Sequence, residues 1–233
     1  MTGAVAILLA AGGGARLGRG PKAFLEIGGR SILSIAAGAA AACRDVEELV
    51  IVVPSGSEER TARQMAAVSK PWRGVGGGRS RQESVRLALE AIPLERPVIV
   101  CHDAARPFAA PELFSAVVAA VEGAGGAVPV LPLADTVKRV RNGYVESTLP
   151  REELRLVQTP QAFAAPTLRD AHARAAGAGG SFTDDAAMLE WAGYRVRAIA
   201  GEPVNFKITT ADDLARAERY VLETMSAAPT PGT

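Results

Sequence analysis

The stretch AVAILLAAGGGARLGRGPKAF, residues 4–24, is the part of the sequence that best indicates the fold. Its first part, Ala4–Leu9, is continuously apolar, as is typical of a buried strand. A burst of glycine follows at once, together with the cations Arg16 and Lys22. Many folds bind phosphate where a strand enters a glycine-rich turn, because backbone N–H groups can approach the anion closely. The stretch therefore predicts a phosphate-binding loop, although several unrelated chemistries use that device.

Composition bounds the class of protein. The chain has 233 residues, 48% of them hydrophobic, and a formal net charge of +1, which suits one globular domain. This charge and the 5% aromatic content disfavour nucleic acid or a membrane surface as a partner. Cys43 and Cys101 lack a Cys-x-x-Cys spacing and are interpreted as core residues in a reducing compartment. With no signal sequence and no membrane-span pattern, we expect a cytoplasmic protein.

Beyond the first loop, short β-branched runs alternate with helical patterns. We expect strands at Ala4–Leu9, Glu48–Val53, Pro97–Cys101 and Ala127–Leu131, and helices at Ile32–Cys43, at Glu58–Val68, after Ser80 and after Pro111. This alternation is typical of βαβ units and predicts a mostly parallel twisted sheet flanked by helices. In such sheets, ligands bind beyond the carboxyl ends of the strands.

Hydroxyl residues mark the expected helix starts. Ser31 is expected to cap the first helix and Thr183 a later one, and capping-box spacing occurs at Ser55 with Glu58, Ser80 with Glu83, and Thr210 with Asp213. We attribute the two carboxylates that follow Thr183, Asp184 and Asp185, to stabilisation of the helix dipole rather than to metal ligation.

The segment TVKRVRNGYVEST, Thr136–Thr148, alternates polar and apolar residues around Asn142-Gly143, which is a strong signal for a two-residue β-hairpin. Its strands carry too many charges to form core, and an isolated hairpin is marginal in water. We therefore expect an arm, at about residues 136–157, that packs against a second copy of the protein. The alternative is a simple exposed surface hairpin. We expect one domain over residues 1–226 and a disordered tail at 227–233.

The glycine-rich loop does not fit the two best-known phosphate-binding patterns. Gly12, Gly14 and Gly18 miss the G-x-G-x-x-G spacing, and the next expected strand ends at Val53 without an acidic residue for a ribose. Lys22 follows proline and precedes alanine, so the Walker pattern fails as well. Glycines with two added cations suit a nucleoside triphosphate. The consecutive glycines also fit a loop that orders only when nucleotide binds.

Further polar clusters occur where a parallel sheet would place a site. GGGRSRQESV, residues 76–85, is a second glycine loop that enters a helix, and CHDAARP, residues 101–107, follows a buried strand. In PVNFKITT, residues 203–210, Lys207 interrupts an apolar run, which is costly unless its ammonium meets an anion. His102 and His172 lack ligand partners at useful spacing, so we interpret both as structural or exposed.

Seven motifs together resemble one family, the 2-C-methyl-D-erythritol 4-phosphate cytidylyltransferases of the non-mevalonate isoprenoid pathway. They are LAAGGGARLG…PK, GG-x-x-RQ-x-SV, HDAARP, DT-x-K, TPQ-x-F, TDDA and NFKIT, in the family's order from Leu9 to Thr210. The resemblance implies an α/β, Rossmann-like nucleotidyltransferase fold with a protruding β-hairpin dimerisation arm, which agrees with the arm expected from the residues. It also implies a homodimer.

The resemblance further implies transfer of CMP from CTP to the phosphate of methylerythritol phosphate, with release of pyrophosphate and without a protein nucleophile. The implied catalytic residues are Arg16, Lys22, Arg151 and Lys207. The implied CTP-binding residues are Ala10, Ala11, Gly12, Gly78, Arg81, Ser84, Asp103 and Ala104, and among them Gly78, Arg81 and Ser84 surround the cytosine. The implied substrate contacts are Arg106, Thr136, Arg151, Thr159 and Thr183, with Thr136 and Arg151 reaching the partner subunit's site. Mg²⁺ is expected mainly on the CTP phosphates, so no protein ligand is named.

Three rival functions stay open at this point. A cytidylyltransferase for another polyol phosphate, such as ribitol 5-phosphate, would share the nucleotide motifs and differ around Arg106, Arg151 and Thr183. An NADP-linked oxidoreductase is disfavoured by the missing acidic ribose ligand and by the Lys207 segment. A nucleotide-binding regulatory protein without turnover would leave the substrate-side cluster unexplained.

Overall fold

The computed structural model describes residues 3–14 and 20–227, with side chains up to residue 224. Arg16 and its neighbours, residues 15–19, lie outside the described residues. The expectation that the glycine-rich loop orders only when nucleotide binds falls on these residues and stays a prediction. The predicted tail at 227–233 lies outside them too, apart from Ala227, which is the last residue of the C-terminal helix.

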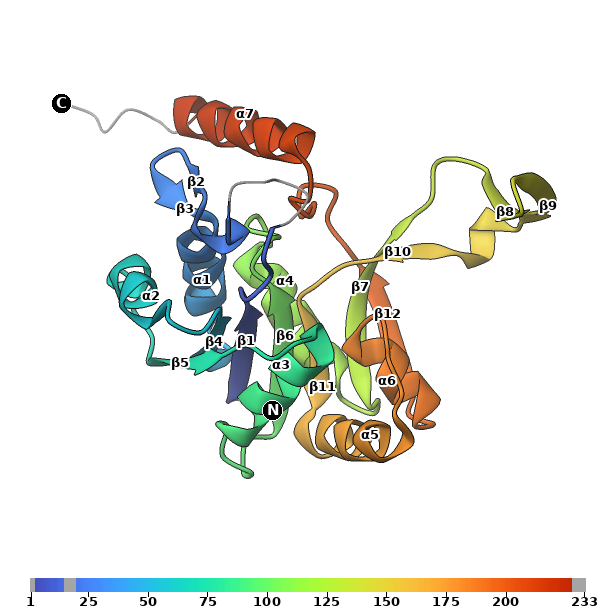
Figure 1. Cartoon of the computed structure of the whole chain (residues 1–233), viewed down its shortest axis with the longest axis horizontal. Helices are drawn as coiled ribbons and strands as arrows, with labels where there is room; N and C mark the ends of the chain where they lie inside the picture. Colours follow the sequence, from blue (N-terminus) through green and yellow to red (C-terminus); the bar gives the residue numbers. More distant parts are fainter. Residues whose placement is uncertain (1–2, 15–19, 228–233) are drawn as a thin grey trace.

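Eight strands of the described chain form one central sheet: β1 (Ala4–Leu9), β4 (Val46–Val53), β5 (Trp72–Gly76), β6 (Val98–Asp103), β7 (Gly126–Pro132), β10 (Arg155–Val157), β11 (Gln161–Ala164) and β12 (Val196–Ala200). Their order in space is β10-β7-β11-β6-β1-β4-β5, with β12 beside β7 (Figure 1). Strands β6, β1, β4 and β5 run parallel to one another. Only β10 and β11 pair antiparallel with their neighbours in this sheet. The expected mostly parallel sheet is confirmed.

Helices cover both faces of this sheet. One face carries α1 (Ile32–Ala42), α2 (Glu58–Met65) and α4 (Pro111–Ala120), and the other carries α3 (Arg81–Glu90), α5 (Ala165–Ala178) and α6 (Asp185–Trp191). Alternate residues of β1 explain its continuous hydrophobicity. Leu8 belongs to the core beneath α1 and α4, whereas Val5 and Ile7 belong to the core beneath α3, α5 and α6. Because both faces are covered, no position of the strand needs a polar residue.

A smaller apolar cluster joins the segment after the glycine-rich loop to the last helix. Helix α7 (Ala211–Ala227) packs on the short hairpin of β2 (Glu26–Ile27) and β3 (Arg30–Ser31), as Figure 1 shows at the top of the molecule. Ile27, Ile208 and Leu214 are buried in this cluster. Lys207 directly precedes Ile208, and Lys22 opens the 3₁₀ turn η2 (Lys22–Phe24) just before β2. The cluster therefore brings together two lysines that are far apart in the sequence.

The predicted hairpin is present as an arm. Strands β8 (Val137–Arg141) and β9 (Tyr144–Leu149) pair antiparallel, and Asn142 and Gly143 have φ values of 51° and 82°. Two consecutive positive φ values are those of a type I′ turn, which confirms the hairpin signal. Figure 1 shows the arm projecting away from the body of the protein. Its apolar residues Val140, Tyr144 and Val145 are exposed in this single chain.

Several local expectations need correction. Strands β5, β10, β11 and β12 were not predicted, because these short strands are held by pairing and lack strong β-branched runs. Ser55 and Glu58 do not form a capping box: Ser57 is the N-cap residue of α2, and Glu58 instead accepts from the backbone N–H of Gly56. Thr183 does not cap α6, because Asp184 takes that position and accepts from the backbone N–H of Ala187.

Two of the expected caps are confirmed and one is confirmed in part. Ser31 accepts from Ser34 at the start of α1. Thr210 and Asp213 exchange bonds at the start of α7: Asp213 N–H donates to the Thr210 hydroxyl, and Thr210 N–H donates to the Asp213 carboxylate. Ser80 caps α3, but the Glu83 carboxylate accepts from Arg79 N–H, one residue before the predicted partner.

Candidate active site

A cavity of about 340 Å³ opens at the carboxyl ends of β1, β5 and β6. Its floor comes from the residues that follow these strands, and it contains most of the residues expected to hold a nucleotide. The lining includes Ala10, Ala11, Gly12, Lys22, Gly78, Arg81, Ser84, Asp103, Ala104 and Lys207. Arg16 cannot be assigned to it, since it lies outside the described residues. The strand ends where a ligand is expected to bind therefore open into a cavity lined by these residues.

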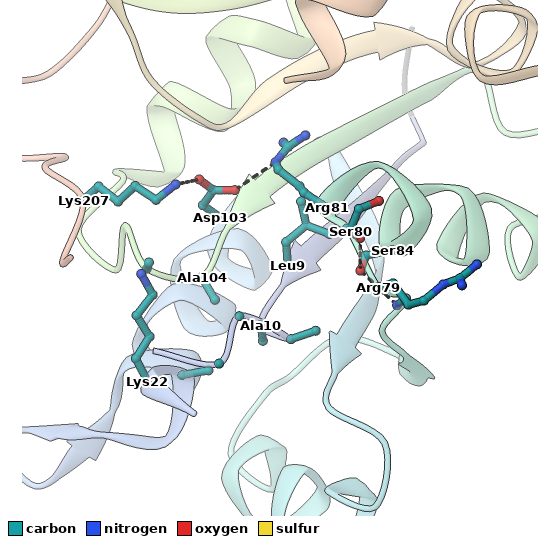
Figure 2. A pocket seen from close by; sticks show the side chains of 16 residues that line it. Leu9, Ala10, Lys22, Arg79, Ser80, Arg81, Ser84, Asp103, Ala104 and Lys207 are labelled. Carbon is teal, nitrogen blue, oxygen red and sulfur yellow. Dashed lines mark hydrogen bonds and ion pairs between the residues drawn. The ribbon is translucent and has the colours of Figure 1, made fainter. Parts of the chain in front are cut away.

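A chain of charges crosses the cavity. Asp103 ends β6, and its two carboxylate oxygens face opposite cations: Lys207 Nζ lies 2.6 Å from Oδ2, and Arg81 Nε lies 3.5 Å from Oδ1. Figure 2 shows Lys207 and Arg81 reaching Asp103 from two sides. Burial alone would raise the pKa of Asp103, but Lys207 and Arg81 hold it at about 2. The group is thus a carboxylate at neutral pH, and it fixes two cations at the cavity wall.

The first and last segments of the chain meet at Lys22. Its Nζ donates to the backbone carbonyl of Ile208, 3.0 Å away, so the glycine-rich loop is tied to the segment of Lys207. Figure 2 shows Lys22 on the same side of the cavity as Lys207. With Arg81, these lysines give the cavity three cations from three separate parts of the sequence, and Arg79, whose side chain points away from them, also lies in the lining (Figure 2). Such a lining suits a polyanionic ligand.

The second glycine loop lets the backbone approach β1 closely. A Cβ at Gly77 would lie 2.4 Å from the Cβ of Ala11, so only glycine fits there. The Ser84 hydroxyl accepts from the N–H of Gly78 and donates to the carbonyl of Ser80. Ser84 therefore fixes the conformation of this loop and also lines the cavity.

Behind Arg81 lies a buried carboxylate that makes more contacts than a helix start requires. Asp185 is fully buried, and its Oδ2 lies 2.7 Å from Arg81 Nη1. Its Oδ1 lies 3.4 Å from Nε2 of the buried His172. Burial would raise the pKa of Asp185, but Arg81 and His172 lower it below its usual value. Asp185 is thus one half of a buried ion pair, so its attribution to the helix dipole alone is wrong.

The residues expected to bind the second substrate do not line this cavity. Thr159 is buried beneath Asp103, where its hydroxyl accepts from Asp103 N–H. Arg106 donates to the carbonyls of Asn205 and Val157. Thr183 is exposed at the start of α6. Thr136 and Arg151 lie together around a second cavity, of about 470 Å³, at the base of the arm.

His102 and His172 are both buried, which confirms the structural interpretation of the two histidines. His102 Nε2 lies 3.0 Å from the carbonyl of Arg106, Nδ1 lies 3.0 Å from the hydroxyl of Thr159, and its ring meets Phe114 edge to face. Burial lowers the pKa of His102 to about 4. Both cysteines are buried and free, as expected of core residues.

This burial predicts acid sensitivity. Between pH 6.5 and 4, His102 takes up a proton in the unfolded chain but stays neutral in the folded chain. The free energy of unfolding therefore falls as the pH is lowered through that window. The expected loss is about 3 kcal/mol over the window. Urea unfolding at pH 7, 5.5 and 4.5 measures it. His102→Gln should flatten the slope of stability against pH, and equal slopes for the two proteins would contradict the prediction.

Among residues 3–14 and 20–227, no group of three or more His, Cys, Asp or Glu side chains is arranged to hold a metal ion. The helices within these ranges include none with both the length and the hydropathy needed to cross a bilayer.

Comparison with known proteins identifies the family. A family model described as IspD: 2-C-methyl-D-erythritol 4-phosphate cytidylyltransferase matches residues 4–223. The bifunctional enzyme IspD/IspF of Anaeromyxobacter sp. (strain Fw109-5) is 46% identical over 94% of this chain, which spans only 57% of that relative's length. The 2-C-methyl-D-erythritol 4-phosphate cytidylyltransferase of Thermus thermophilus is 43% identical, over 92% of this chain and 95% of its own.

Solved structures agree with this assignment. The 4-diphosphocytidyl-2C-methyl-D-erythritol synthase of Anaerococcus prevotii superposes with a TM-score of 0.86 at 27% identity, covering 95% of this chain and 96% of its own. The Thermus thermophilus cytidylyltransferase superposes with a TM-score of 0.78 at 38% identity, covering 95% of this chain and all of its own. The motifs, the fold and these relatives lead to one conclusion: the chain belongs to the 2-C-methyl-D-erythritol 4-phosphate cytidylyltransferase family.

Proposed function

We propose that this chain transfers CMP from CTP to 2-C-methyl-D-erythritol 4-phosphate and releases pyrophosphate. The observation that carries the proposal is the cavity at the strand ends, where Lys22, Arg81 and Lys207 surround a floor of alanine and glycine. Three cations and close backbone approach suit a triphosphate. The family membership supplies the identity of the nucleotide and of its acceptor.

In the proposed reaction, a phosphate oxygen of the acceptor attacks the α-phosphorus of CTP in line. The new P–O bond forms as the bond to the β-phosphate oxygen breaks, and pyrophosphate leaves. No protein nucleophile is needed, so catalysis consists of positioning and charge stabilisation. Lys207 is assigned to the α-phosphate, and Lys22 to the departing phosphates. The same role for Arg16 rests on the family resemblance alone.

The nucleotide is proposed to lie along Ala10–Gly12 and Asp103–Ala104, with the cytosine near Gly78, Arg81 and Ser84. Asp103 is the cavity's one carboxylate in the described lining, and both of its oxygens already face cations. Such a donor set fits Mg²⁺ only as an ion carried mainly by the CTP phosphates, where it would neutralise triphosphate charge. Two buried thiols without a disulfide support a cytoplasmic location.

The acceptor is proposed to bind at Arg106, Thr159 and Thr183, together with Thr136 and Arg151 of the partner subunit. Thr136 and Arg151 share the cavity at the base of the arm, away from the nucleotide cavity of their own chain. The exposed apolar residues of the arm would be covered in a homodimer. We propose one catalytic domain over residues 1–226, with the arm as its dimer contact.

A pyrophosphate-release assay tests the function. The protein is incubated with CTP, Mg²⁺ and either methylerythritol phosphate or ribitol 5-phosphate. Release with methylerythritol phosphate supports the proposal. Release with ribitol 5-phosphate alone would replace it with the rival polyol phosphate, and absence of release with both would reject transfer. Hydride transfer releases no pyrophosphate, so the oxidoreductase alternative is tested separately, by following the absorbance of NADPH.

Mixing variant subunits tests the shared site. Arg151→Ala is expected to impair use of methylerythritol phosphate while CTP still binds, and Lys207→Ala removes the cation at the nucleotide. In a mixed dimer, the Arg151→Ala subunit keeps its own Lys207 and receives an intact Arg151 from its partner. One of the two sites is then complete, so about half of the wild-type activity should return. The homodimer of each variant is the control. No recovery in purified mixed dimers would contradict sharing.

A further inference from the structure

The segment that carries Lys207 has no regular secondary structure of its own. It joins β12 to α7, and we call residues 201–210 the lysine loop. Such a loop positions a side chain well only if other groups fix its backbone. The question is which residues hold Lys207 at 2.6 Å from Asp103.

One buried side chain outside the loop contacts it more than once. Gln158 follows the last residue of β10 and is only 3% exposed. Its amide Nε2 donates to the carbonyls of Glu202, at 2.8 Å, and Asn205, at 3.1 Å. Its Oε1 accepts from the N–H of Glu202, at 3.0 Å. Both amide protons and the amide oxygen are therefore used on the lysine loop.

The fit around this amide is tight. A Cβ at Gly201 would lie 2.5 Å from Gln158 Oε1, so the loop can approach the amide only because residue 201 is glycine. Within the loop, Asn205 N–H donates to the carbonyl of Glu202, which closes a turn around the amide. Asn205 Nδ2 donates in return to the carbonyl of Thr159, next to Gln158. The contact is reciprocal, and Lys207 lies two residues beyond it.

The same junction connects the loop to the arm. Gln158 continues directly from β10, and the Arg106 guanidinium donates both to Asn205 in the loop and to Val157 at the end of that strand. Beyond the junction, Ile208 N–H donates to the carbonyl of Ala105, just after β6. The lysine loop is thus fixed on both sides of Lys207, by Gln158 before it and by Ala105 after it.

We propose that Gln158 is a positioning residue whose amide holds the lysine loop so that Lys207 faces Asp103 and the reacting phosphate. The role of Lys207 in this statement rests on the proposed function. Gln158 is not among the lining residues of the nucleotide cavity. Its effect is therefore expected in the chemical step, with little effect on CTP binding.

The test replaces Gln158 with methionine, which has a similar volume and makes none of these hydrogen bonds. Gln158→Met is expected to lower kcat about 10-fold and to change the dissociation constant for CTP less than 3-fold. In a Lys207→Ala background the same substitution should have less than a 2-fold effect, because it acts through Lys207. The matched control is Gln161→Met, since Gln161 is equally buried and donates to Asp184 and to the backbone carbonyl of Gln158, but not to the lysine loop.

Hydrogen exchange gives a readout that does not require turnover. In Gln158→Met, the amides of residues 201–208 should exchange at least 10-fold faster, while those of β1 and α3 keep their wild-type rates. If Gln158→Met does not fold, Gly201→Ala tests the same contact from the other side and should give the same pattern.

The outcomes separate the two proposals. A wild-type protein without transfer activity rejects the proposed function, and hydrogen exchange alone then decides whether Gln158 holds the loop. An active wild type with unchanged kcat in both folded variants overturns the positioning role. So does unchanged exchange in the lysine loop. A slower kcat that is additive with Lys207→Ala also overturns it.

Discussion

Lys207→Ala is expected to lower kcat/KM by about 10²-fold or more, as the loss of a charge aimed at a transition state does. The ammonium lies 2.6 Å from Asp103, and the Lys207 side chain lines the cavity and is 40% exposed, so it can reach a ligand without leaving its partner. Removing it leaves the Asp103 carboxylate with only the longer Arg81 contact, at 3.5 Å. The negative charge of Asp103 would then be less well neutralised and would repel the triphosphate, in addition to the lost attraction between Lys207 and the triphosphate.

Steady-state kinetics with CTP and methylerythritol phosphate measures this loss, with circular dichroism as the check on folding. Lys70→Ala is the matched control, because Lys70 donates to the backbone carbonyls of Cys43 and Val46 at the opposite end of β4 and touches nothing in the cavity. The Lys70→Ala variant also lacks one lysine, but its kcat/KM should equal that of the wild type. Near-normal turnover in Lys207→Ala would remove Lys207 from the mechanism.

The parts of the fold that local sequence determines could be predicted. Ala4–Leu9 matches β1 at both ends, because a strand covered on both faces must be apolar throughout. Asn142-Gly143 forms the expected turn, since few residue pairs accept two positive φ values. The costly position of Lys207 correctly predicted that its ammonium meets an anion, and the anion within this chain is Asp103.

Features that depend on distant partners could not be predicted in this way. β11, with the sequence QAFA, is a strand because β6 and β7 flank it, and nothing in those four residues requires it. Asp185 pairs with Arg81, 104 residues away, so the sequence shows only two acidic residues at a helix start. Gln158 lacks charge and periodicity, and its role depends on a loop 44 residues further on. The sequence did contain one sign that Asp185 has a further partner: two acidic residues occur in succession at a helix start where a single N-cap is enough.

Asp185→Ala is expected to cost about 1.5–3 kcal/mol of unfolding free energy, because it removes the buried carboxylate that pairs with Arg81 and leaves Arg81 Nη1 without this acceptor. Arg81 Nη1 would lose its 2.7 Å contact, and the guanidinium would keep only the looser one to Asp103. Burial alone would lower the pKa of Arg81, but the carboxylates of Asp185 and Asp103 outweigh it and raise that pKa, so the guanidinium keeps its proton.

Denaturant unfolding of Asp185→Ala, Arg81→Met and the double variant measures the coupling between the two residues. The double variant should be more stable than the sum of the single losses predicts, because it leaves neither charge buried alone. Asp184→Ala is the control from the adjacent position, where it removes an N-cap worth about 1 kcal/mol together with the acceptor of the Gln161 amide. Equal losses for Asp184→Ala and Asp185→Ala would mean that both act only as helix caps. A larger loss for Asp185, suppressed when Arg81 is replaced, would establish that α6 contributes to the nucleotide cavity through the ion pair beneath it.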